Sequence, residues 1–177
     1  MKKVLILEAW KSKPDHNWYP WLKQELEKRG FEVLVPDLPT HQTDLPDLQK
    51  ELEFVKKLNF LDKDTVVIGH SLGAVLGMRL GEIYKFKKLI TVAGWDYNDL
   101  CAEHKLYWKT MIEHKKIKSN VKEIYCIGSN NDPYYTAISF EDTANRLGAK
   151  FILIKNKRHF SKSSGNVTKF YQLLKLA

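Results

Sequence analysis

Ser71 is the side chain whose sequence surroundings most clearly indicate chemistry. It lies in Gly69-His70-Ser71-Leu72-Gly73, a G-x-S-x-G motif that follows the apolar run Val66-Val67-Ile68 and precedes a helix-like stretch over residues 74–84. A motif of this kind between a strand and a helix is typical of a nucleophile elbow, which lifts a serine hydroxyl off the carboxyl edge of a parallel sheet. Glycines suit such a turn because its backbone is strained and passes close to neighbouring elements. The motif therefore predicts Ser71 as a nucleophile.

A serine hydroxyl needs a base within hydrogen-bond reach, and that base needs an acid to orient it. On a sheet with this elbow the chain order is serine, acid, histidine, with the acid and the histidine on later strand-end loops. Asp132 follows a strand-like run at residues 124–127, and His159 follows one at residues 150–154. We predict Asp132 as the acid and His159 as the base. Asp96, which follows the preceding strand-like run, is a rival acid.

Strand-like and helix-like segments alternate along the 177 residues. Such a series predicts one α/β domain over residues 1–177, with about six mostly parallel strands and helices on both faces. Ligands then bind beyond the carboxyl ends of the strands. Residues 95–120 exceed a plain crossover, and we expect one or two helices there that roof the pocket. The predicted strands are residues 4–7, 31–35, 65–68, 89–93, 124–127 and 150–154, and the predicted helices are residues 18–29, 48–58, 74–84, 140–147 and 167–176.

Composition argues against several other classes of protein. The net charge is +8, but the lysines are scattered and no nucleic-acid motif accompanies them, so we expect a solvated basic surface and no nucleic-acid partner. Apolar runs are only strand-sized, and the first residues are too short and too charged for a signal peptide, so we expect no membrane span and a cytoplasmic protein. Neither metal-ligand spacing nor a nucleotide-binding motif is present, so no metal or cofactor is expected.

Four stretches of the chain carry a family resemblance. They are Asn17-Trp18-Tyr19-Pro20-Trp21-Leu22, His70-Ser71-Leu72-Gly73, Asn131-Asp132-Pro133 and His159-Phe160. With them the chain resembles the RBBP9/YdeN family of small serine hydrolases over nearly its whole length, and the tryptophan-rich helix start is the most family-specific piece. The resemblance implies a minimal α/β-hydrolase with the nucleophile after the third strand, and hydrolysis of a carboxylic ester or amide.

Two loops depart from the pattern of that family. The first strand usually ends there in His-Gly or a glycine-rich loop, whereas this chain has Glu8-Ala9-Trp10. By the resemblance, this loop supplies one backbone N–H of the oxyanion hole, from Ala9 or Trp10, and Leu72 supplies the other. The bulk of Trp10 is expected to narrow the site. Arg158 stands before His159 where the family often has glycine, and we expect it to alter that loop.

Aromatic and histidine side chains near the strand ends suggest the form of the pocket. Trp10 and Trp95 follow the first and fourth predicted strands, so we predict that they line the substrate pocket; packing at the rim of the sheet is the alternative. Trp18 is expected to be a core residue of the first helix. His104 and His114 belong to the polar segment 95–120 and are expected to be solvated.

Two hypotheses of different classes follow. The first is a serine hydrolase that cleaves a small carboxylic ester or amide through an acyl-enzyme intermediate on a Ser-His-Asp triad, without a cofactor. The second is a catalytically weak or inactive hydrolase-like scaffold that binds a protein or a small ligand. The altered Glu8-Ala9-Trp10 loop and the basic surface favour the second, and no particular protein partner is indicated.

Overall fold

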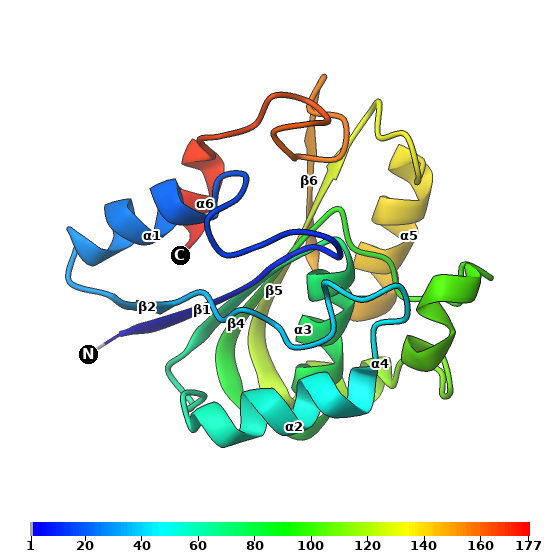
Figure 1. Cartoon of the computed structure of the whole chain (residues 1–177), viewed down its shortest axis with the longest axis horizontal. Coiled ribbons are helices and arrows are strands. Elements are labelled where there is room, and N and C mark those ends of the chain that lie inside the picture. The colour runs from blue at the N-terminus through cyan, green and yellow to red at the C-terminus, as the bar shows by residue number, and fades with distance from the viewer. Residues whose placement is uncertain (1) are drawn as a thin grey trace.

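One parallel sheet organises the molecule. The computed structural model describes residues 2–177, and within them six strands pair in the order β2-β1-β3-β4-β5-β6, all parallel (Figure 1). The chain reverses its direction across the sheet between β1 and β3, and ligands of such sheets bind at this switch point. The strands are β1 (Lys3–Leu7), β2 (Glu32–Leu34), β3 (Val66–His70), β4 (Phe86–Val92), β5 (Val121–Ser129) and β6 (Lys150–Ile154).

Helices cover both faces of the sheet. One face packs against α1 and α6, which lie together in Figure 1, and the other against α2, α3, α4 and α5. Each face has its own apolar core, because both surfaces of the sheet are buried under helices. The helices are α1 (Tyr19–Glu27), α2 (Leu48–Leu58), α3 (Leu72–Ile83), the 3-10 helix η1 (Ala102–Tyr107), α4 (His114–Asn120), α5 (Ala137–Leu147) and α6 (Tyr171–Leu176).

Local sequence signals set several helix ends. Asp47 caps α2 by accepting hydrogen bonds from the amides of its first turn, and Thr136 caps α5 in the same way. Gly148 ends α5 in the left-handed conformation that favours glycine, as its position behind the predicted helix suggested. The two N-caps begin their helices after a loop, and Gly148 turns the chain from α5 into β6.

The predicted fold class is confirmed, with differences at element boundaries. The strands β4 and β5 begin earlier than expected because Phe86 and Val121 already pair with one another. The final helix is shorter than predicted, because Val167 and Phe170 are buried in irregular chain before Tyr171 begins the helix. The segment 95–120 contains two short helices, η1 and α4, as expected.

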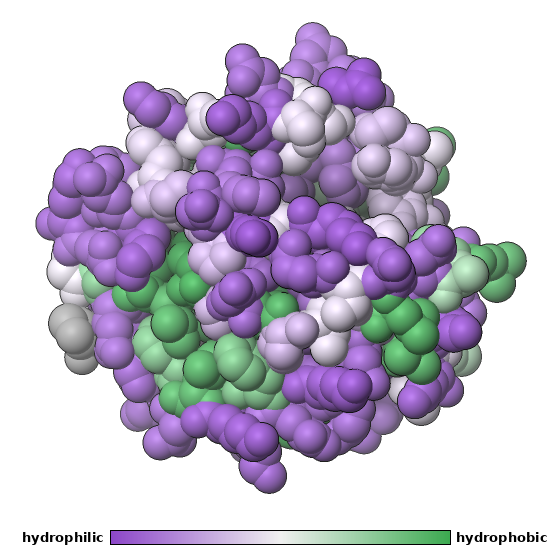
Figure 2. Space-filling model, in the orientation of Figure 1, coloured by the Kyte–Doolittle hydropathy of each residue, from purple (hydrophilic) through white to green (hydrophobic). Residues whose placement is uncertain are grey.

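Hydrophilic residues cover most of the face seen in Figure 2, and apolar ones gather between strand β2 and helix α2. No helix within residues 2–177 is long and apolar enough to cross a membrane.

Candidate active site

The turn between β3 and α3 holds Ser71 in a strained backbone conformation. Its φ of 54° and ψ of −119° are rare for a residue with a side chain. A Cβ on Gly73 would clash with the carbonyl oxygens of Leu7 and Glu8 in the neighbouring strand β1 and its loop, so this close approach requires glycine. The serine consequently lies at the carboxyl edge of the sheet beside the loop that follows β1.

Ser71, His159 and Asp132 come together from three strand-end loops. The Nε2 atom of His159 lies 2.9 Å from Ser71 Oγ, and its Nδ1 lies 2.8 Å from Asp132 Oδ2. A carboxylate only accepts hydrogen bonds, so Nδ1 carries a proton and a neutral ring presents Nε2 as the acceptor for the serine hydroxyl. The Asp132 side chain is fully buried, and its other oxygen accepts the Tyr134 amide at 2.9 Å.

The rival acid, Asp96, forms its hydrogen bonds with side chains other than His159. Arg146 donates two hydrogen bonds to its carboxylate at 2.7 and 2.6 Å, and His114 and Thr143 donate one each. Burial raises the pKa of Asp96, but these donors and the nearby guanidinium outweigh burial, and the net shift is downward. The structure therefore pairs His159 with Asp132 and joins Asp96 to helices α4 and α5.

Hydrogen bonds join the loop after β5, which carries Asp132 (the acid loop), to the loop after β6, which carries His159 (the histidine loop). The Ser129 hydroxyl accepts the Lys157 amide at 3.1 Å, and the Asn131 side chain accepts the Arg158 amide at 2.9 Å. Arg158 has a φ of 45°, in the left-handed region that glycine adopts without strain. Arg158 therefore adopts a backbone conformation that suits glycine, and its amide forms one of the hydrogen bonds between the two loops.

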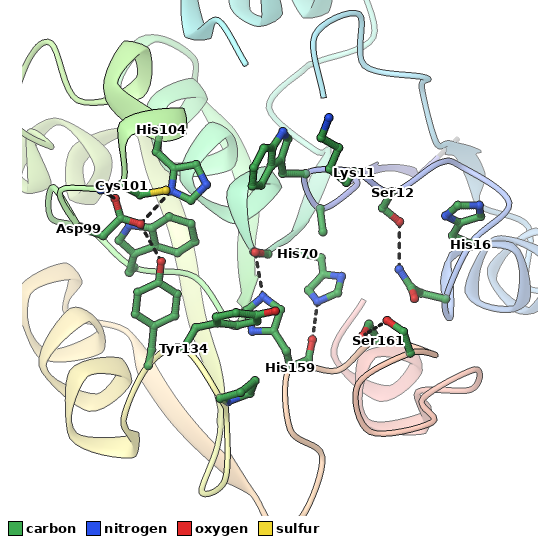
Figure 3. Close-up of a pocket in the computed structure, with 18 of the residues that line it drawn as sticks. Lys11, Ser12, His16, His70, Asp99, Cys101, His104, Tyr134, His159 and Ser161 are labelled. Carbon is green, nitrogen blue, oxygen red and sulfur yellow. Dashed lines mark hydrogen bonds and ion pairs between the residues drawn. The ribbon is translucent and has the colours of Figure 1, made fainter. Parts of the chain in front are cut away.

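A buried chain of hydrogen bonds links the loop after β1, which contains Ala9, to the histidine loop. The Ala9 amide donates to the Tyr19 hydroxyl at 3.1 Å, and this hydroxyl lies 2.7 Å from His70 Nδ1. His70 Nε2 lies 2.8 Å from the His159 carbonyl oxygen (Figure 3). Because a carbonyl only accepts, His70 carries its proton on Nε2 and accepts the Tyr19 hydroxyl at Nδ1. Burial, followed by the nearby His159, lowers the pKa of His70 to about 3, so the ring is neutral.

The start of α1 also holds the histidine loop. The Trp18 indole donates to the Phe160 carbonyl at 3.1 Å, and the Asn17 side chain accepts the Lys162 amide at 2.8 Å. The sequence predicted Trp18 only as a core residue. It is fully buried as expected, but the motif that begins this helix also positions the loop of His159.

The predicted oxyanion hole needs a correction at Ala9. Its amide donates to the Tyr19 hydroxyl and is not a free donor, because Tyr19 extends from α1 beneath the loop. The amides of Trp10 and Leu72, in contrast, have no acceptor within the described part of the chain. Two of the three candidate donors therefore remain.

Ser71 and His159 open into a cavity of about 800 Å³. Trp10 and Trp95 line it, as do Tyr134 and Tyr135, which the sequence reasoning missed although only Pro133 separates them from the predicted acid. Trp95 stacks on Tyr135 with ring centroids 4.6 Å apart. In Figure 3, Asp99, Cys101 and His104 lie on one side of His159, and Ser12, His16 and Ser161 lie on the other.

The expectation of a solvated side chain is wrong for His104, whereas His114 is partly exposed, with 26% of its side chain accessible. His104 is buried in the cavity wall and bonds to Asp99, and His114 donates to the buried Asp96 at 2.6 Å. The polar sequence suggested exposure, but Asp99 and Asp96, which follow β4, accept hydrogen bonds from these two rings. Among residues 2–177, no three His, Cys, Asp or Glu side chains are grouped to hold a metal ion.

A parallel sheet with a strained serine after its third strand, and a histidine–carboxylate pair on later loops, is the architecture of the α/β-hydrolases. The profile described as serine hydrolase matches residues 4–174, and the chain belongs to that family.

Known proteins agree with this assignment. The chain is 30% identical over 164 residues to serine hydrolase RBBP9 of Rattus norvegicus, covering 91% of this chain and 84% of that protein. It is 25% identical over 171 residues to YdeN of Bacillus subtilis, covering 93% and 88%. The crystal structure of the ydeN product superposes with a TM-score of 0.89 at 21% identity, covering 99% of this chain and 96% of that one. The predicted family and the predicted hydrolase class are confirmed.

Proposed function

We propose that the protein hydrolyses small carboxylic esters or amides through an acyl-enzyme intermediate, with Ser71 as nucleophile, His159 as base and Asp132 as orienting acid. The observation that carries this proposal is the unbroken hydrogen-bond chain from Ser71 Oγ through His159 to Asp132. The buried carboxylate holds the imidazole in the tautomer that can accept the serine proton, and it stabilises the imidazolium that forms.

In the proposed reaction, Ser71 Oγ bonds to the substrate carbonyl carbon and its proton moves to His159 Nε2. The negative carbonyl oxygen is stabilised by the Leu72 and Trp10 amides, and their lack of an acceptor among residues 2–177 supports this role. The carbonyl then re-forms, and the alcohol or amine leaves with the proton from His159. A water molecule, activated in the same way, releases the acid and restores the serine.

A fluorophosphonate probe tests the proposal, because only an activated serine reacts with it rapidly. We expect wild type to be labelled and to hydrolyse short-chain esters, and Ser71→Ala to lose the labelling and at least about a thousandfold in turnover. Full turnover in Ser71→Ala would overturn the assignment of Ser71. A wild-type protein that resists the probe would instead favour a binding scaffold.

The aromatic walls are expected to limit the acyl chain. Trp10 is fixed at the cavity by a hydrogen bond of 2.8 Å from its indole to the Thr43 carbonyl. Rigid aromatic walls restrict length, so we predict a preference for acyl groups of roughly two to six carbons. Each methylene that fits contributes up to about 0.8 kcal/mol. Trp10→Ala should move the optimum to longer chains, as measured by kcat/KM on a series of esters; an unchanged profile would contradict this picture.

A further inference from the structure

A second histidine–carboxylate pair lies in the cavity wall, outside the proposed triad. His104 Nδ1 is 2.8 Å from Asp99 Oδ2, and the same oxygen accepts the Tyr135 hydroxyl at 2.9 Å. The other carboxylate oxygen accepts the Cys101 amide at 3.2 Å. The Asp99 carboxylate is thereby fixed from three directions, and it fixes the His104 ring in turn.

The His104 ring is enclosed by the two tryptophans that line the cavity. Its centroid lies 5.3 Å from that of Trp10 and 5.4 Å from that of Trp95, and the residue is only 9% exposed. Its Nε2 atom has no hydrogen-bond partner within residues 2–177, and Figure 3 shows it pointing toward the middle of the cavity. A nine-tenths buried ring thus presents one unpartnered nitrogen to the space beside the proposed nucleophile.

The partners of this ring decide what its free nitrogen can bind. Burial raises the pKa of Asp99, hydrogen bonds from His104, the Tyr135 hydroxyl and the Cys101 amide lower it, and the net shift is downward. Asp99 is therefore a carboxylate, which only accepts, so the proton of the neutral ring lies on Nδ1 and Nε2 offers a lone pair. In the described part of the chain, Asp99 forms an ion pair with His104 alone, so this side of the cavity carries negative charge when the ring is neutral.

We propose that His104 and Asp99 form a specificity subsite for an acyl group that ends in a hydrogen-bond donor, an ammonium or a hydroxyl. The inference rests on the proposed function, which places the acyl chain against Trp10 and Trp95. Pockets of this kind are largely apolar, with a few fixed polar groups that select the ligand. A site built to bond a polar group rejects analogues that lack it, because its own buried group is then left unpaired. A carboxylate at the same position is repelled by Asp99.

Two matched pairs of substrates test the subsite. Methyl butyrate is compared with β-alanine methyl ester, which has nearly the same shape but ends in an ammonium, and methyl hexanoate is compared with 5-aminopentanoate methyl ester. Monomethyl succinate supplies the carboxylate. Each kcat/KM is divided by the rate constant of that ester with hydroxide, so that intrinsic reactivity cancels.

We expect wild type to favour the ammonium ester over its alkyl partner by at least about tenfold at one of the two lengths, with the succinate ester poorest. His104→Phe keeps an aromatic ring between the tryptophans but removes the nitrogen, and it should bring the ratio near one. Asp99→Asn, which preserves the shape of the side chain, should also lower the ratio. The matched control is His16→Phe, an exposed histidine across the same cavity, which should keep the wild-type ratio.

The ratio of kcat/KM for the ammonium ester to kcat/KM for its alkyl partner distinguishes a role in substrate recognition from a role in stabilising the fold. A purely structural loss lowers kcat/KM for both esters of a pair alike and leaves their ratio unchanged. A wild-type ratio near one at both lengths, or an unchanged ratio in His104→Phe and Asp99→Asn, would overturn the subsite. If fluorophosphonate still labels Ser71 in that case, the proposed function stands without it. If wild type is not labelled, the proposed function fails and the subsite fails with it.

Discussion

Ser71 has the same hydroxyl as any other serine, and its expected reactivity comes from its neighbours. The strained turn presents Oγ to the cavity, and His159 lies 2.9 Å away to take the proton. Asp132 is held for its proposed role as the orienting acid, since one oxygen faces His159 and the other accepts backbone amides of its own loop. The Asp96 carboxylate is buried to a similar extent, but it accepts two hydrogen bonds from Arg146 and none from His159.

Asparagine substitutions distinguish the two aspartates. Asp132→Asn should lower kcat by about ten-thousandfold, because an amide facing Nδ1 favours the wrong imidazole tautomer. Asp96→Asn should leave most of the turnover per folded molecule, but it should destabilise the protein by about 1–3 kcal/mol, because the hydrogen bonds to the buried carboxylate are disrupted while the partly exposed Arg146 guanidinium remains solvated. Steady-state kinetics and urea unfolding on both variants measure this. A larger loss of kcat in Asp96→Asn would reverse the assignment of the acid.

At the scale of elements, helix α1 connects two loops that meet at the site. Tyr19 bonds to the Ala9 amide after β1 and to His70 at the end of β3, while Trp18 bonds to Phe160 after β6. The first helix therefore does more than cover the sheet, because its first turn sets the position of the histidine loop. This gives a physical reason for the tryptophan-rich motif at its start.

Removing one hydroxyl from this network tests its importance. Tyr19→Phe leaves the Ala9 amide and His70 Nδ1 buried without a partner, so we expect a loss of about 1–3 kcal/mol in stability and a lower kcat. Tyr171→Phe is the matched control, because Tyr171 is 57% exposed and its hydroxyl has no partner in the described residues. Thermal unfolding and ester kinetics provide the comparison. Equal behaviour of the two variants would show that the network contributes nothing.

At the scale of the whole molecule, one buried carboxylate makes stability depend on pH. Glu8 is fully buried below the loop that carries Trp10, and one of its oxygens accepts the Leu38 amide at 3.1 Å. Burial, together with the charges of Asp37 and Glu51, raises the pKa of Glu8 to about 8 despite this bond. The folded state therefore keeps a proton that the unfolded chain releases near its ordinary value of 4.5.

This difference fixes the sign of the pH effect. The stability that Glu8 contributes is fully present below pH 4.5, falls as pH rises toward about 8, and levels off above it. Glu8→Gln removes the titration, so its stability relative to wild type should increase with pH by up to about 1.4 kcal/mol per unit. Urea unfolding at pH 5, 7 and 9 measures this, with the exposed Glu141→Gln as control. A constant difference between Glu8→Gln and wild type would show that Glu8 is not protonated in the fold.

Much of the architecture could be predicted from the sequence because its signals are local. The alternation of apolar runs and helical spacing indicated the parallel sheet, and Gly69 and Gly73 around Ser71 indicated the elbow. Chain order and strand-end position then named Asp132 and His159, although their catalytic roles remain to be tested. Helix boundaries were less certain, since Val167 and Phe170 satisfy an apolar pattern whether they lie in a helix or in a buried loop.

The sequence by itself thus determined the class of fold and the family. Only the tertiary structure decided that His159 faces Asp132 rather than Asp96, that Tyr19 takes the Ala9 amide, and that His104 turns inward to Asp99. These outcomes depend on which polar groups meet once the strands are side by side. A hydrogen bond across 89 positions, such as that from His70 to the His159 carbonyl, leaves no periodicity or spacing in the chain by which it could be read.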